Sequence, residues 1–129
     1  MIKISVLGDI MCEWPFLNAA SSVDGKYDFS GAFDGIKGFL KESDFIIGNL
    51  ETPVAGQKLE YTKRNALYSF NTPSEFLNEL KLLGVDLLLT ANNHCADRGI
   101  EGLLNTIDEL DAQGIKHTGT YRSESDDIF

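Results

Sequence analysis

Three apolar stretches of the sequence each end in polar residues that could bind a metal ion. Asp9 follows the first stretch, Asn49 and Glu51 end the second, and residues 92–94, two asparagines and a histidine, follow the third. Carboxylate and amide oxygens with one imidazole suit a divalent cation such as manganese, magnesium, iron or zinc. These acceptors would repel one another without a cation, because the nearest positive side chain in the sequence is Arg98.

Each of these residues also has an ordinary explanation. An aspartate at the end of a strand commonly caps a turn or a helix, and paired asparagines are common in loops. Their occurrence after three successive strands is what indicates a shared site. The carboxyl ends of adjacent parallel strands form one crevice, so side chains that are distant in sequence can meet there.

The residues before these side chains are predicted to form the strands of a parallel sheet. Residues 4–7, 44–50 and 85–89 are continuous apolar blocks, which are typical of strands buried on both faces. Residues 115–119 are a predicted fourth strand. The polar residues therefore belong to neighbouring strand ends.

Helical patterns separate the strands, in residues 31–43, 71–84 and 99–114. The second helix has the clearest limits. Thr72 is predicted to cap it, with Pro73 at the first helical position and Glu75 completing a capping box. Gly84 is predicted to end it.

The predicted order is β-α-β-α-β-α-β, which indicates a layered α/β fold with a mainly parallel sheet and helices on its faces. Residues 12–30 and 52–72 follow strands and have no clear period, so they are predicted to be long loops at the carboxyl edge. No repeat or linker divides the sequence. Residues 1–129 are therefore predicted to form a single α/β domain.

The composition narrows the class of protein. Of 129 residues, 43% are hydrophobic and 24% are charged, as in a globular domain. A formal charge of -9 opposes binding to nucleic acid. The sequence contains no signal peptide and no apolar run long enough to cross a membrane, which favours a cytoplasmic location. The two cysteines lie far apart in sequence and are predicted to be thiols.

Three motifs resemble the bacterial capsule synthesis CapA family, also described as poly-gamma-glutamate biosynthesis proteins, in the calcineurin-like metallophosphoesterase superfamily. They are GDIM at 8–11, GNLETP at 48–53 and ANNHCADRGIEGLLNTIDELDAQGIKHTG at 91–119. The resemblance implies that the chain corresponds to the N-terminal half of a four-layer α/β/β/α metallophosphoesterase fold. It also implies a role in capsule synthesis, and family members are often anchored to the membrane and face outward.

The resemblance also implies roles for the strand-end residues. Asp9 would bind one metal ion, Asn49 or Glu51 would occupy the place of a bridging carboxylate, and Asn93 would be a further ligand. His94 would contact phosphate or protonate the leaving group. With one or two divalent ions, manganese, iron, zinc or magnesium, such a site would hydrolyse a phosphoester.

The motif at residues 91–119 also contains the predicted substrate-binding residues Asn92, Asp97 and Arg98. The substrate would be a phosphoester or an anionic capsular polymer.

The sequence also departs from the superfamily pattern. Met11 stands where a histidine ligand is usual, and Asn49 stands where an aspartate is usual. The later histidine ligands are missing, because the only other histidine, His117, lies in a predicted strand and is interpreted as structural. The chain is therefore predicted to be a truncated domain or a natural fragment. Whether it is an enzyme by itself stays open.

Other functions remain as alternatives. The chain could be a non-catalytic half-domain that binds an anionic capsular polymer, with Lys58, Lys63 and Arg64 as the basic residues. It could work with a missing C-terminal segment, or form a homodimer through its sheet edges. A nucleotide-binding domain is disfavoured, because the sequence contains no glycine-rich phosphate loop.

A second metal site would use the two thiols. Cys12 and Cys95 could form a zinc-like set with Asp9 and His94. Packing of both cysteines as small apolar side chains is the favoured interpretation.

Overall fold

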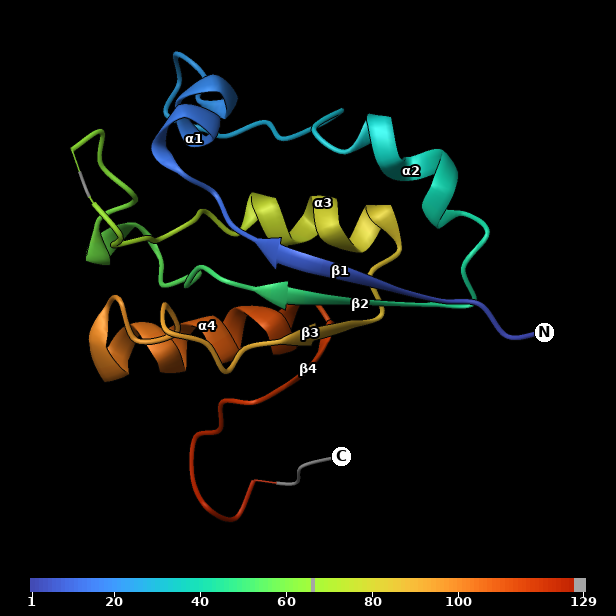
Figure 1. Cartoon of the computed structure of the whole chain (residues 1–129). Coiled ribbons are helices and arrows are strands. Elements are labelled where there is room, and N and C mark those ends of the chain that lie inside the picture. The colour runs from blue at the N-terminus through green and yellow to red at the C-terminus, as the bar shows by residue number, and fades with distance from the viewer. Residues whose placement is uncertain (66, 127–129) are drawn as a thin grey trace.

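Four parallel strands form one sheet in the computed structural model of the chain, which describes residues 1–65 and 67–126 (Figure 1). The strands lie in chain order, and every neighbouring pair is parallel. The predicted α/β class with a parallel sheet is therefore confirmed. The strands are β1 (Ile4–Ile10), β2 (Phe45–Leu50), β3 (Leu87–Leu89) and β4 (Lys116–Thr118).

The connections contain the three predicted helices, one α-helix that was not predicted, and a short 3-10 turn in residues 52–72 that was not predicted either. Residues 12–30 contain a helix instead of the predicted irregular loop. Pro15 fits the first turn of this helix, and Leu17 and Ala20 are buried on its inner side. The helices are α1 (Trp14–Ala20), α2 (Asp34–Leu40), α3 (Glu75–Leu83), α4 (Gly99–Ala112) and a short 3-10 turn, η1 (Gln57–Leu59).

The start of α3 differs from the prediction. The helix begins at Glu75 instead of Pro73, and Thr72 does not cap it. The Thr72 hydroxyl is hydrogen-bonded to that of Thr52 at 2.7 Å, and both side chains are buried. This tertiary contact occupies the hydroxyl that the predicted capping box required. The end of α3 is as predicted, because Gly84 takes the left-handed conformation at φ 94°.

The helices cover one face of the sheet. Ile46 of β2 and Leu88 of β3 belong to the same buried apolar cluster as Leu80 of α3 and Leu110 of α4. Removing these side chains from water supplies the main driving force for packing the helices onto the sheet. Figure 1 shows α3 running beside β1 and α4 running beside β3 and β4.

The opposite face of the sheet is open. Ile4 and Val6 of β1 and Leu89 of β3 point to this face and are 60%, 73% and 39% exposed. The prediction that the strands are buried on both faces is therefore wrong for the described chain. A continuous apolar block shows that both faces of a strand are apolar, but it does not show that the same chain covers both.

The long connection after β2 is fixed by one buried side chain. The Asn71 amide nitrogen donates to the carbonyl oxygens of Gly56 and Glu60 at 3.0 and 3.1 Å. Its oxygen accepts from the backbone N–H of Ala55 at 2.8 Å. Because Asn71 is fully buried, these bonds lack competition from water and fold the segment back onto itself.

None of the helices within residues 1–65 and 67–126 is long and apolar enough to cross a membrane. The cytoplasmic location stays a prediction.

Threonine contacts fix the chain after β3 and β4. The Thr90 hydroxyl donates to the carbonyl oxygen of Thr118 at 3.0 Å and is hydrogen-bonded to the Thr120 hydroxyl at 2.8 Å. Gly119 lies between them at φ 117°, where an added Cβ would come within 2.6 Å of the Ala91 backbone nitrogen. Only glycine allows β4 to approach the start of the 91–94 segment so closely.

We expect Gly119→Ala to lower the free energy of unfolding by roughly 1–3 kcal/mol, because it adds a backbone clash at a positive φ. Urea unfolding followed by circular dichroism measures the loss. Gly35→Ala is the matched control, since its Cβ would meet nothing within 4 Å in α2. The control should be neutral or stabilising by up to about 1 kcal/mol. Equal effects of the two substitutions would contradict the packing argument.

Candidate functional site

Hydrogen bonds connect polar side chains from three strand ends. The Asn49 amide nitrogen donates to Asp9 Oδ1 and to Glu51 Oε2, both at 2.8 Å. The Asn92 amide nitrogen donates to Asn49 Oδ1 at 3.1 Å and to the carbonyl oxygen of Leu50 at 2.8 Å. We name Asp9, Asn49, Glu51 and Asn92 the strand-end cluster. The structure thus brings together four of the residues that the sequence singled out.

A bulge in β1 makes this meeting possible. Val6 pairs with Ile47 and Asp9 pairs with Asn49, so β1 advances by one residue more than β2 between the two pairs. Paired residues point to the same face of a sheet. Without the extra residue, Gly8 would pair with Asn49 and Asp9 would point to the opposite face. The bulge therefore turns Asp9 toward Asn49, on the open face.

The two carboxyl groups of the cluster influence each other. The pKa of Glu51 is raised, first by its hydrogen bond with the Asp9 carboxyl group and then by desolvation and the negative charge of Asp9. The pKa of Asp9 is lowered, first by the hydrogen bond from Asn49 and then by Glu51. The two carboxyl groups share one amide donor, and they repel each other whenever both are ionised. A cation between them would relieve this repulsion.

His94 lies beside the cluster in a fixed orientation. Its Nδ1 is 2.8 Å from Asp97 Oδ2, and the same oxygen accepts from the backbone N–H of Phe70 at 2.7 Å. The Phe70 ring packs against the imidazole with a centroid distance of 4.6 Å. The His94 backbone N–H donates to Asn92 Oδ1 at 3.0 Å, which connects the histidine to the cluster.

These contacts leave one side of the imidazole available. Nδ1 of His94 is paired with Asp97, whereas Nε2 forms no hydrogen bond with any residue in the described ranges. The contact with Asp97 fixes the orientation of the ring. It also favours the tautomer in which Nδ1 carries the proton and donates it to the carboxylate. Sequence reasoning missed Phe70, because nothing in its type or neighbours connects it with a distant histidine.

Within the described ranges, the other predicted site residues form no side-chain hydrogen bond with the cluster. Asn93 is exposed. Arg98 points to the η1 turn, where Nε donates to the carbonyl oxygen of Leu59 at 2.8 Å and Nη1 donates to the Ser69 hydroxyl at 2.6 Å. Asp97 orients His94. The metal role of Asn93 and the substrate roles of Asp97 and Arg98 stay predictions.

The thiol alternative gains no support. Cys12 is fully buried, and burial raises the pKa of its thiol to about 12, so it is protonated near neutral pH. Zinc binds the thiolate form. Within the described ranges, no three His, Cys, Asp or Glu side chains are grouped so that they could hold a metal ion. A cation at the cluster would therefore need amide oxygens, water or ligands from elsewhere in addition to Asp9 and Glu51.

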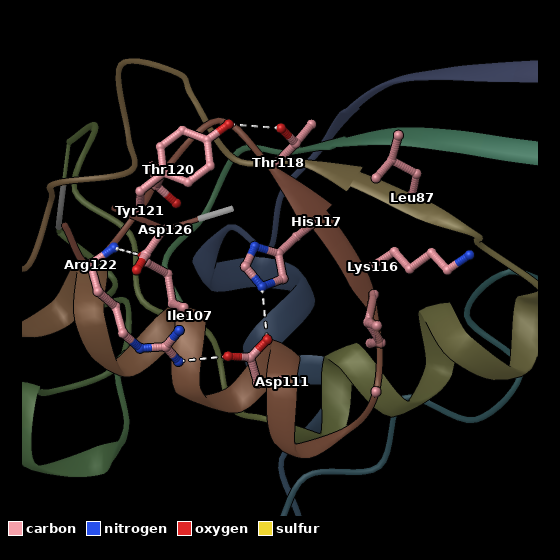
Figure 2. Close-up of a pocket in the computed structure, with 12 residues that line it drawn as sticks. Leu87, Ile107, Asp111, Lys116, His117, Thr118, Thr120, Tyr121, Arg122 and Asp126 are labelled. Carbon is pink, nitrogen blue, oxygen red and sulfur yellow. Dashed lines mark hydrogen bonds and ion pairs between the residues drawn. The ribbon is translucent and has the colours of Figure 1, made fainter. Parts of the chain in front are cut away.

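A cavity of about 760 Å³ lies away from the cluster, against β4 and α4 (Figure 2). In Figure 2, Asp111 lies between His117 and Arg122, with His117 Nε2 at 3.1 Å and Arg122 Nη2 at 2.6 Å from its oxygens. The pKa of Asp111 is lowered, first by Arg122 and then by His117. These interactions agree with a structural role for His117.

The fold and the cluster together define a class of protein. It is a parallel α/β domain whose polar site lies at the carboxyl ends of neighbouring strands. The chain belongs to the bacterial capsule synthesis protein PGA_cap family, whose sequence model matches residues 3–128. The resemblance inferred from the three motifs is thereby confirmed, and it is consistent with the calcineurin-like superfamily.

Curated relatives agree with the family. The chain is 29% identical over 126 residues to the PGA biosynthesis protein CapA of Bacillus subtilis, a match that covers 98% of the chain and 32% of that protein. It is 27% identical over 119 residues to the capsule biosynthesis protein CapA of Bacillus anthracis, covering 92% of the chain and 28% of that protein. The chain thus spans about a third of the length of these relatives.

We expect Glu51→Gln to raise the melting temperature at pH 7 without divalent cations. Because the pKa of Glu51 is raised, the protonated Glu51 side chain stabilises the fold fully at pH values below the ordinary pKa of glutamate. This stabilisation is lost as the pH rises through the raised pKa. The neutral amide removes the repulsion with Asp9. Near pH 4, about the ordinary pKa of glutamate, Glu51 of the wild-type protein becomes protonated. The difference in melting temperature between wild type and Glu51→Gln should therefore shrink.

Thermal unfolding in EDTA at both pH values measures the effect. Glu101→Gln, an exposed charge removal on α4, is the matched control and should change little. A lower melting temperature for Glu51→Gln at pH 7 would mean that the carboxyl pair is not repulsive.

Proposed function

We propose that the chain is the N-terminal, cation-binding part of a CapA-like capsule synthesis domain that hydrolyses phosphoesters with the help of divalent metal. The observation that carries this proposal is the Asp9–Glu51 carboxyl pair, which shares the Asn49 amide donor at 2.8 Å on both sides. Family membership supports the capsule role, because the named relatives are CapA proteins of PGA and capsule biosynthesis.

The chemistry of the cluster fits a hard or borderline divalent cation. Asp9 and Glu51 supply two carboxylates, and the cluster amides can supply neutral oxygens. Oxygen donors favour magnesium or manganese, whereas a nitrogen from His94 would widen the choice to iron or zinc. Asn49 uses its oxygen for Asn92 here, so it would have to release that bond before it could bind a cation.

The chain's own residues would divide the catalytic work. A bound cation would polarise a phosphoryl oxygen and lower the pKa of a bound water. The open Nε2 of His94 can give a proton to a leaving oxygen, while Asp97 holds the ring by Nδ1. Phe70 keeps Asp97 in place through its backbone N–H and limits the ring's movement by packing.

A second candidate function is a non-catalytic half-domain for the assembly of an anionic capsular polymer. The incomplete donor set favours it, because the described residues offer no group of three His, Cys, Asp or Glu ligands. Both candidates share the cation site and differ in whether this chain performs the chemistry. In either case the remaining ligands would come from a further segment of the longer domain or from a second copy.

We expect metal-stripped protein to bind manganese in a saturable way, and Asp9→Ala to abolish this binding, because Asp9 is one of two carboxylates in the site. Isothermal titration calorimetry measures both. Glu101→Gln is the control for loss of one negative charge. Absence of heat with correctly folded wild type would overturn the cation site in this chain.

An assay with bis(p-nitrophenyl) phosphate and manganese then separates the two candidates. Hydrolysis that His94→Gln lowers by about a hundredfold would support catalysis by this chain. Manganese binding without hydrolysis would favour the half-domain function.

We expect Asn49→Asp to tighten manganese binding by at least roughly tenfold, because it places a third negative charge at the site. It should also lower the melting temperature of the cation-free protein, since the new carboxylate would face Asp9 and Glu51 without an amide donor. Asn78→Asp, on the exposed side of α3, controls for the added charge. Unchanged affinity in Asn49→Asp would mean that the cation binds elsewhere.

A further inference from the structure

A groove separate from the strand-end cluster lies between α1 and the segment 61–64. It encloses about 380 Å³. Its walls combine three aromatic rings, those of Trp14, Tyr27 and Tyr61, with two cations, Lys63 and Arg64. In Figure 1, α1 and the loop that contains residues 61–64 lie at the end of the sheet to which the β1 and β2 arrows point.

Arg64 is held at this groove by an aromatic ring. Its guanidinium carbon lies 5.4 Å from the centre of the Trp14 ring. Arg64 forms no ion pair with any carboxylate in the described part of the chain. A guanidinium that lies over a ring and has no carboxylate partner keeps N–H groups available, and these can form two parallel hydrogen bonds with a carboxylate.

Lys63 adds a second positive charge beside Arg64. Its ammonium group lies 2.8 Å from Glu60 Oε2, and both side chains are largely exposed. An exposed pair of this kind contributes little stability, so a ligand anion can take the place of Glu60.

The aromatic part of the lining is held firmly in place. The rings of Tyr27 and Tyr61 meet edge to face at a centroid distance of 5.4 Å, and both are half-buried. Tyr27 also stacks on the buried Phe29 at 6.4 Å. The loop that carries Tyr61 is held by two hydrogen bonds at the η1 turn, from Asn71 to the carbonyl oxygen of Glu60 and from Arg98 to that of Leu59. Such rings offer an apolar surface to methylene groups, with hydroxyls at their edge.

The two cations and three aromatic rings of the groove stand out because the chain as a whole is acidic. A net charge of -9 opposes the approach of polyanions to the chain as a whole. The groove joins an arginine without a carboxylate partner, a weakly paired lysine and apolar rings. A ligand with spaced carboxylates on a flexible chain of methylene groups would satisfy all three.

We propose that the groove between α1 and the segment 61–64 binds a carboxylate-bearing polymer, with Arg64 as its main anion contact and Tyr27 and Tyr61 as its apolar wall. The choice of polymer rests on the proposed capsule function, whereas the site itself requires no metal. The lining residues of the groove come from the connections that follow β1 and β2, and the strand-end cluster lies at the carboxyl ends of the same two strands and of β3.

The chain carries its own reporter for a test. Trp14 is the only tryptophan, so intrinsic tryptophan fluorescence reports on this groove alone. A γ-linked glutamate oligomer is titrated into the whole chain in EDTA, and calorimetry under the same conditions measures binding independently of fluorescence. Polyphosphate of similar length and an uncharged γ-linked glutamine oligomer are the comparison ligands.

Saturable binding of the glutamate oligomer is expected, with weakening at high salt. Arg64→Ala should lower the affinity about tenfold or more, because it removes a charge-assisted bidentate contact. Lys37→Ala is the matched control, since it removes one exposed positive charge on α2, outside the groove. Circular dichroism confirms that each variant is folded.

Three results would overturn the proposal. They are no binding by either method, equal effects of Arg64→Ala and Lys37→Ala, or tighter binding of polyphosphate than of the glutamate oligomer. Since EDTA removes divalent cations, none of these results depends on the cation site. The manganese titration of the same protein shows separately whether the proposed function fails.

Discussion

The extra residue in β1 is the constraint on which the candidate site depends. Between the Val6–Ile47 and Asp9–Asn49 pairs it shifts the side-chain alternation by one position, so that Asp9 and Asn49 share a face. The amide of Asn49 can then bridge Asp9 and Glu51, and Asn92 completes the chain of contacts from β3. A regular strand with the same sequence would separate the two carboxylates by the thickness of the sheet.

Much of the fold could be predicted from local patterns. The apolar blocks and the helical stripes each follow from periodicities that a short segment contains, and a parallel sheet follows from their alternation. The errors come from contacts between distant segments. Thr72 is used by Thr52 and not by its own helix, and α1 forms because Leu17 and Ala20 find a core that residues 12–30 do not reveal.

The site was predictable in its members but not in its geometry. Asp9, Asn49, Glu51 and Asn92 could be selected because strand ends meet at one edge of a parallel sheet. Their hydrogen bonds depend on a bulge that the sequence does not mark, since Gly8 beside Asp9 fits either a bulge or a turn. Nor does the sequence reveal that Arg98 supports the η1 turn, because that choice depends on carbonyl groups distant in sequence.

Covering the open face of the sheet would be energetically coupled to cation binding at the Asp9–Glu51 pair. Asp9 points to this face and lies in water. A segment or partner that covers Ile4 and Val6 would also desolvate the Asp9 carboxylate. This desolvation costs much free energy when the charge is uncompensated and little when a cation neutralises it. A cation at the proposed site and a cover on this face would therefore bind cooperatively, and by reciprocity each would raise the affinity of the other by the same factor.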